Sequence, residues 1–63
     1  MAALFVRYMR ASLKDEVDAA AMYSRMIKLA KGMPHAQQVL TEIRNDERDH
    51  YRLLVKLSRE LGL

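Results

Sequence analysis

Residues 31–34 read Lys31-Gly32-Met33-Pro34, and this stretch is the one strong break in the chain. Glycine suits the left-handed backbone position after the end of a helix, and proline suits the first turn of the next helix. On both sides of the break, apolar residues recur with a helical period. We therefore predict a helix from about residue 4 to residue 31, a turn at 32–34, and a second helix from 34 to about 61, ended by Gly62.

Each predicted helix carries one stripe with a four-three spacing. The stripes are, on the first helix, Met9, Leu13, Glu16, Ala20, Tyr23, Ile27 and Ala30, and on the second, Ala36, Leu40, Ile43, Glu47, His50, Leu54, Leu57 and Leu61. A stripe of this kind is the face that a helix buries against a partner. One turn joins two helices of similar length, so the predicted fold class is all-α: a single antiparallel two-helix hairpin over 1–63.

Three polar residues interrupt the stripes, and we predict that they lie at the same height. Glu16 lies seventeen residues before Met33, whereas Glu47 and His50 lie fourteen and seventeen residues after it. In an antiparallel hairpin, Glu16 therefore faces the Glu-x-x-His pair, whose members share one helix face. A carboxylate or imidazole among apolar residues has to be paired, hydrogen-bonded or bound to a metal. The pattern is typical of a metal site inside a helical bundle.

The composition predicts self-association. Of the residues, 51% are hydrophobic, and two helices alone cannot enclose a core. We expect a homodimer that forms a four-helix bundle, or a ring of such dimers. A dimer would bring together four carboxylates and two imidazoles, and two divalent cations would balance the four carboxylates. Carboxylate-rich sites suit iron or manganese, with zinc as a further alternative.

Other features of the composition narrow the functional classes. Cysteine is absent, so the sequence offers no disulfide and no thiolate metal site. No apolar run approaches the ~18 residues that a membrane span needs, and the first residues do not match a signal peptide, so we expect a cytoplasmic protein with no membrane partner. The net charge is +3, and a basic stripe follows the second helix at Arg44, Arg48, Arg52 and Lys56. We interpret this stripe as a solvated face with Asp49 beside Arg52, and a nucleic-acid partner is not expected.

Two segments resemble a known family. The first is Glu16-Val17-Asp18-Ala19-Ala20-Ala21-Met22-Tyr23, and the second is Asp46-Glu47-Arg48-Asp49-His50. Together with the turn they cover roughly residues 14–61 and resemble one half of a ferritin-like bundle of the rubrerythrin kind. Two-helix chains with this pattern are similar to the encapsulated ferritins, which belong to the ferritin-like superfamily.

The resemblance implies a function. It implies a di-iron carboxylate protein with ferroxidase activity, an oxidoreductase that oxidises ferrous to ferric iron with two irons held between two subunits. Glu16 and Glu47 would be the carboxylate ligands, His50 the nitrogen ligand, and Tyr23 a hydrogen-bond partner of the ligands. Asp15 and Asp18 would form an accessory metal site. An encapsulating protein shell stays open as a partner, with a location inside a protein compartment as the alternative to a free cytoplasmic protein.

Two other classes of function stay open on the sequence alone. The first is a non-enzymatic helical dimerisation module in which Glu16, Glu47 and His50 form a polar network that sets the pairing register, or in which Arg48 or Arg52 pairs with them. The second is a basic nucleic-acid-binding hairpin. Tight, stoichiometric iron binding would favour the ferroxidase, and steeply salt-dependent retention of nucleic acid would favour the hairpin.

Overall fold

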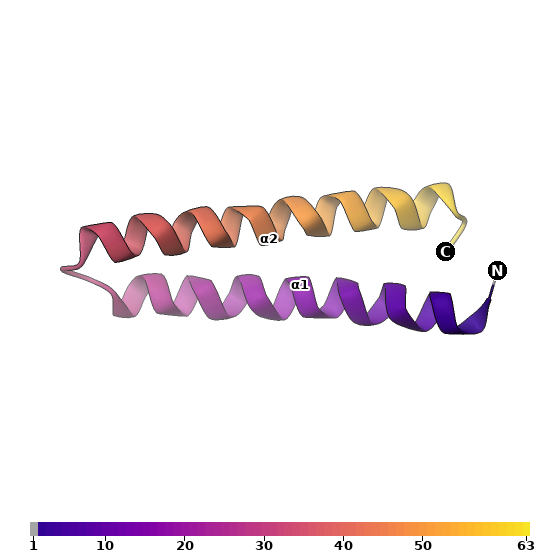
Figure 1. Cartoon of the computed structure of the whole chain (residues 1–63), viewed down its shortest axis with the longest axis horizontal. Helices are drawn as coiled ribbons and strands as arrows, with labels where there is room; N and C mark the ends of the chain where they lie inside the picture. The colour runs from indigo at the N-terminus through magenta and orange to yellow at the C-terminus, as the bar shows by residue number, and fades with distance from the viewer. Residues whose placement is uncertain (1) are drawn as a thin grey trace.

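The chain folds into two long helices that run antiparallel, side by side (Figure 1). A computed structural model describes residues 2–63, and within them helix α1 spans Ala3–Leu29 and helix α2 spans Pro34–Glu60. The described residues include no strand. Both ends of the chain lie at the same end of a hairpin whose longest extent is 48 Å. The prediction of an all-helical hairpin is confirmed, and each helix boundary falls within two residues of its predicted place.

The turn between the helices has the backbone geometry that its sequence predicts. Gly32 has a φ of 88°, in the left-handed region that favours glycine. The Met33 amide donates a hydrogen bond to the Ala30 carbonyl at 2.9 Å, which closes the turn. Met33, with φ −120° and ψ 79°, lies outside the helical region that a following proline disfavours, and Pro34 occupies the first turn of α2. Glycine and proline therefore set the point at which the chain reverses.

A side-chain hydrogen bond ties the two helices together next to the turn. Gln37 Nε2 donates to the backbone carbonyl of Ile27 at 3.0 Å, and so satisfies one of the last carbonyls of α1 that have no partner within the helix. On the same helix, the Thr41 hydroxyl donates to the Gln37 carbonyl. This link was not predicted from the sequence, because no sequence pattern distinguishes a glutamine that bonds across the hairpin from a glutamine that is exposed to solvent.

The C-terminal end of α2 is closed by a glycine, as predicted. Gly62 has a φ of 73°, its amide donates to the Arg59 carbonyl, and the Leu63 amide donates to the Ser58 carbonyl at 2.9 Å. These two bonds are the pair that defines a Schellman motif. They satisfy carbonyls that the helix itself leaves without donors.

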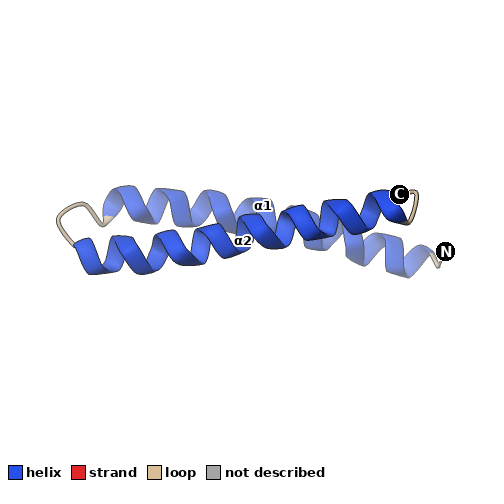
Figure 2. Cartoon of the chain, turned by 90° about the horizontal axis from the view of Figure 1, so that it is seen from above, coloured by secondary structure: helices blue, strands red, loops and turns tan. Residues whose placement is uncertain are grey.

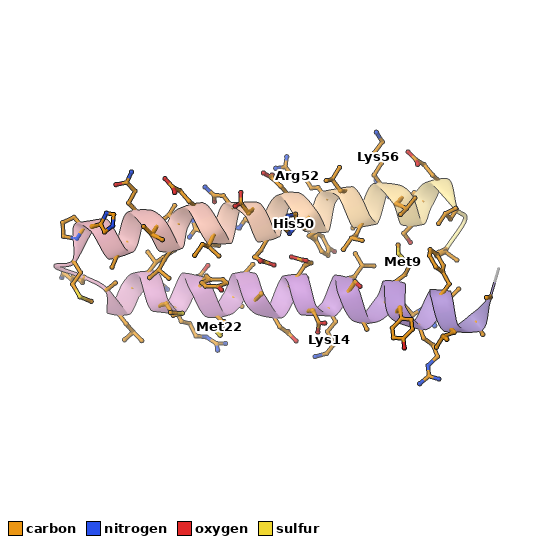
Figure 3. The ribbon with its side chains drawn as sticks, viewed as in Figure 1. Met9, Lys14, Met22, His50, Arg52 and Lys56 are labelled. Atoms are coloured by element: carbon orange, nitrogen blue, oxygen red, sulfur yellow. The ribbon has the colours of Figure 1, made fainter. Side chains whose placement is uncertain are left out.

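The stripe of α1 faces α2 along its whole length. All seven of its residues are buried or half-buried, and Met9 points toward α2 while Lys14 and Met22 point away (Figure 3). The stripe of α2 is covered less completely, because His50, Leu57 and Leu61 are exposed. Among the described residues only Met9 and Ala30 are buried, and neither is completely shielded from solvent. As expected for two helices, the hairpin encloses almost no core of its own.

The uncovered apolar residues gather on one side of the hairpin. The helices cross at a shallow inclination (Figure 2), so each leaves a flank open. Apart from Val17 and Tyr51, which line a groove on the opposite side, the helical period of about 100° per residue puts most of the exposed apolar residues of both helices on one flank. They are Leu4, Tyr8, Met22, Met26 and Leu29 of α1, and Val39, Leu53, Leu57 and Leu61 of α2. We call this side the apolar face. Across residues 2–63, neither helix contains an apolar stretch suited to crossing a membrane.

Candidate metal centre

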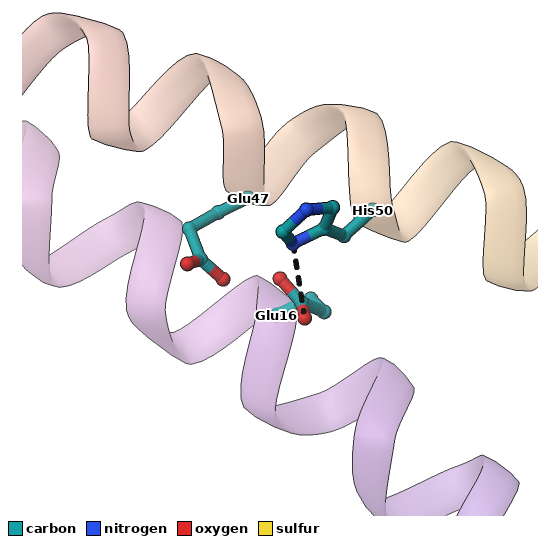
Figure 4. A group of neighbouring side chains, drawn as sticks. All are labelled: Glu16, Glu47 and His50. Carbon is teal, nitrogen blue, oxygen red and sulfur yellow. Dashed lines mark ion pairs between the residues drawn. The ribbon is translucent and has the colours of Figure 1, made fainter.

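Glu16 of α1 meets Glu47 and His50 of α2 at the centre of the hairpin (Figure 4). One ligand atom of each side chain lies within 4.8 Å of one ligand atom of the other two. The Nδ1 atom of His50 lies 3.6 Å from Oε1 of Glu16. In residues 2–63 this is the one group of three acidic, histidine or cysteine side chains with such spacing. The structure therefore brings together the three residues whose common height the residue count predicted.

The two glutamates occupy the midpoints of their helices. Each helix has 27 residues, with 13 on each side of Glu16 in Ala3–Leu29 and 13 on each side of Glu47 in Pro34–Glu60. The cluster is thus about equally far from the turn and from the open end of the hairpin. Helical backbone supports it on both sides, so its position does not depend on a loop.

The three side chains differ in exposure. The Glu16 side chain is 20% exposed, and its Oε2 atom is buried without a hydrogen-bond partner. The His50 side chain is 57% exposed. The expectation that His50 lies buried in the stripe is therefore wrong for one hairpin. The physical reason is that α1 covers one flank of α2, whereas His50 lies toward the other flank, on the apolar face.

The electrostatics of the cluster reflect two crowded carboxyl groups. The pKa of the Glu47 carboxyl is raised above its usual value, first by a hydrogen bond shared with Glu16, then by burial and by the negative charge of Glu16. The charge of His50 acts in the opposite direction. Glu47, next to Glu16, thus holds its proton more readily than an isolated carboxyl group does. A cation placed between them would take over the role of that proton.

The spacing of the ligand atoms suits a metal ion after small movements. Two ligand atoms that are each about 2.1 Å from one ion lie at most about 4.2 Å apart. The observed limit of 4.8 Å is close to this, and glutamate and histidine side chains can rotate within it. Two carboxylates and one imidazole form a donor set that suits iron, manganese or zinc. One hairpin supplies only three such side chains, which leaves coordination positions open.

Glu16 lies between grooves on opposite sides of the hairpin. One groove, of about 430 Å³, is lined by Ser12, Glu16, His50, Leu53 and Leu54 and opens on the apolar face. The other, of about 380 Å³, is lined by Glu16, Val17, Ala20, Arg48, Tyr51 and Arg52. His50 and Arg48 are two residues apart and so lie on roughly opposite sides of α2. The cluster is therefore reachable from the apolar face and from the face that carries Arg48.

The other predicted site residues lie outside the cluster. Tyr23 is half-buried in the stripe of α1, and its hydroxyl makes no hydrogen bond to residues of the described chain. Asp15 and Asp18 are exposed, and Asp18 forms an ion pair with Lys14 at 2.8 Å. Asp49 forms the predicted pair with Arg52. The ligand-partner role of Tyr23 and the accessory site at Asp15 and Asp18 stay predictions.

The environment of two residues near the cluster was not predicted from the sequence. Ser12 lines the groove on the apolar face one helical turn before Glu16, and its i, i+4 spacing to Glu16 was the available signal. Arg44 was assigned to the solvated basic stripe, but it is half-buried, and its Nε atom is buried without a partner. Neither Arg48 nor Arg52 forms an ion pair with Glu16 or Glu47 in residues 2–63.

Comparison with known proteins adds no further assignment. The chain matches no protein-family model, no curated protein and no solved structure. The chemistry of the three side chains and the geometry of the hairpin are therefore the basis for a functional proposal.

Proposed function

We propose that the chain is a di-iron carboxylate protein with ferroxidase activity, at a metal site completed by a second copy. The observation that carries the proposal is the convergence of Glu16, Glu47 and His50 within 4.8 Å at the helix midpoints. The buried, unpartnered Oε2 of Glu16 and the raised pKa of Glu47 both indicate a missing positive charge. Bound cations would supply that charge.

A second hairpin placed on the apolar face would complete the site. A two-fold axis across the helices at their midpoints would pair the apolar faces along their full length and bring the two clusters together. This arrangement is a four-helix bundle with four glutamates and two histidines at its centre. It would cover His50 and the exposed leucines of α2, and it follows from the central position of Glu16 and Glu47. The dimer, like the iron site, is part of the proposal.

The chemistry asked of these residues is modest. Ferrous iron is the substrate: two ferrous ions give two electrons to dioxygen, which with two protons becomes hydrogen peroxide. The side chains hold two ions at a distance where both reach one dioxygen, typically about 3.5–4 Å. Glu16 and Glu47 neutralise the ions, and His50 adds a neutral nitrogen ligand. The apolar residues of both hairpins would limit the access of water.

Metal content and solution mass test the proposal together. The protein is purified without added metal, loaded anaerobically with ferrous iron, and measured for bound iron and for oxidation after air is admitted. We expect a dimer with two irons, and loss of most bound iron and oxidation in Glu47→Ala and His50→Ala with helicity retained. Glu42→Ala is the matched control, because it removes an exposed carboxylate of the same helix. Unchanged oxidation in both ligand variants would refute the assignment.

The helical dimerisation module is the second candidate function. The closeness of the Glu16 and Glu47 carboxyl groups, which raises the pKa of Glu47, supports it, because a carboxyl pair that shares a proton can fix the register of two helices without metal. It predicts a stable dimer that is indifferent to iron and manganese. Dimerisation without any iron retention would therefore favour this candidate over the ferroxidase.

A further inference from the structure

The face opposite the apolar face carries an aromatic ring between two basic grooves. Tyr51 lines the groove that holds Arg48 and Arg52, and it also lines a second groove, of about 460 Å³, with Arg52, Val55, Lys56, Arg59 and Glu60. The two grooves therefore meet at Tyr51, whose surface is 39% exposed. Arg52 and Lys56 point away from α1 (Figure 3). We call this surface the tyrosine–arginine face.

Most of the positive charge on this surface lacks a partner. Arg52 is paired with Asp49, and Glu60 lines the far end of the second groove. Within residues 2–63, Arg48, Lys56 and Arg59 form no ion pair. The four basic residues follow one another at intervals of about 4.5–6 Å along the helix axis. They form a line of cations beside the exposed ring.

In place of the solvated face that the sequence suggested, we infer that the tyrosine–arginine face binds single-stranded nucleic acid, with a base stacked on Tyr51 and phosphates on Arg48, Lys56 and Arg59. An aromatic platform combined with a line of cations is the arrangement that holds single strands without reading their sequence. Val17 and Ala20 line the first groove together with Arg48 and Arg52, so the groove offers apolar surface for the base next to two guanidinium groups. An acidic protein as the alternative partner would use the cations, but it would not require the exposed ring of Tyr51.

The surface is compatible with the proposed dimer and does not rest on it. Arg48 and His50 lie on roughly opposite sides of α2, so a second copy on the apolar face would leave Tyr51 open. A dimer would then present two such surfaces on its outer sides. The inference also stands for a hairpin that binds no metal, because none of the four proposed contact residues, Tyr51, Arg48, Lys56 and Arg59, is a member of the cluster.

The test is a polarisation titration of the full chain with a fluorescein-labelled oligothymidylate at several salt concentrations. Three or four phosphate contacts to a single strand predict a plot of log affinity against log salt with a slope of about −2 to −3. Tyr51→Ala should weaken binding by about one to two orders of magnitude and leave that slope unchanged, whereas Tyr51→Phe should bind like wild type. Lys56→Gln should reduce the slope by about 0.7.

A matched control separates a site from general attraction to a basic protein. Arg25→Gln removes one exposed positive charge from α1 and should leave the affinity within about twofold of wild type. Equal losses in Arg25→Gln and Lys56→Gln would overturn the inference, as would the absence of binding at low salt. Polyglutamate that competes as strongly as unlabelled oligothymidylate would also overturn it, because the surface would then be a general one for acidic polymers. Circular dichroism of each variant verifies that the helices are retained.

Discussion

Polar groups have partners in the segment next to the turn, whereas at the centre of the hairpin they are left partly without partners. Near the turn, the Gln37 side chain satisfies the Ile27 carbonyl, Gly32 has the positive φ that glycine tolerates, and Pro34 lies in the first turn of α2. At the centre, Glu16 has a buried oxygen without a partner, and the pKa of Glu47 is raised by its neighbour. The turn segment is therefore arranged for stability. The centre leaves a buried polar atom of Glu16 unsatisfied in the isolated hairpin, which is typical of residues kept for binding.

Metal binding at the centre is expected to change the stability of the hairpin most. If Glu16, Glu47 and His50 bind ions, ferrous iron or manganese at a hundred times its dissociation constant should stabilise the fold by about 2.7 kcal/mol. For a chain of this size the melting temperature should rise by more than about 10 °C. The rise should fade as the pH falls toward about 5, because the ligands must be deprotonated to coordinate. Thermal melts followed by circular dichroism at fixed protein concentration measure it.

A matching loss in Glu16→Ala would assign the effect to the shared cluster rather than to surface carboxylates. Asp18→Ala is the suitable control, because Asp18 lies outside the cluster and is paired with Lys14. If neither metal changes the melting temperature at neutral pH, the residues at the centre form a network that sets the register of the helices, and their role is structural like that of the turn.

An intermediate effect is expected at the turn. Gly32→Ala places a Cβ where no atom lies within 4 Å, so the change acts through the backbone φ of 88° alone. A left-handed φ costs a non-glycine residue about 1–2 kcal/mol. The melting temperature should drop by roughly 4–8 °C for each kcal/mol lost. Gly62→Ala, with a φ of 73° near the end of the chain, should have a smaller effect because that end can fray.

The smallest expected effect concerns the metal-free centre. The Glu47 pKa is raised above 4.5, so the folded protein binds its proton more tightly than the unfolded chain does. The stabilisation by this proton is complete below pH 4.5 and is lost as the pH rises through the raised pKa. Glu47→Gln should therefore be slightly more stable than wild type at neutral pH without metal, and the difference should vanish in acid. Equal stability of the two proteins across this window would show that Glu47 is not strained.

Sequence reasoning reached most of the fold and the members of the cluster. The break at Gly32 and Pro34 sets where the chain reverses. Because the rise per residue of an α-helix hardly varies, the number of residues from the turn gives the distance along the helix axis, and Glu16 could be placed opposite Glu47 and His50. The same reasoning did not find the Gln37 link, the half-burial of Arg44 or the exposure of His50. These depend on how far each helix is rotated about its axis, which a stripe several residues wide does not specify.

The sequence by itself determined two helices, their lengths, their antiparallel direction and the height of the three polar residues, because these properties follow from local backbone preferences and a regular helical rise. Only the tertiary structure decided which flank of each helix is covered. The rotation of α2 about its own axis leaves His50 open on the apolar face and puts Tyr51 in one groove with Arg48 and Arg52 on the other side. Such a rotation is set by the fit of side chains across the interface, which no single helix contains.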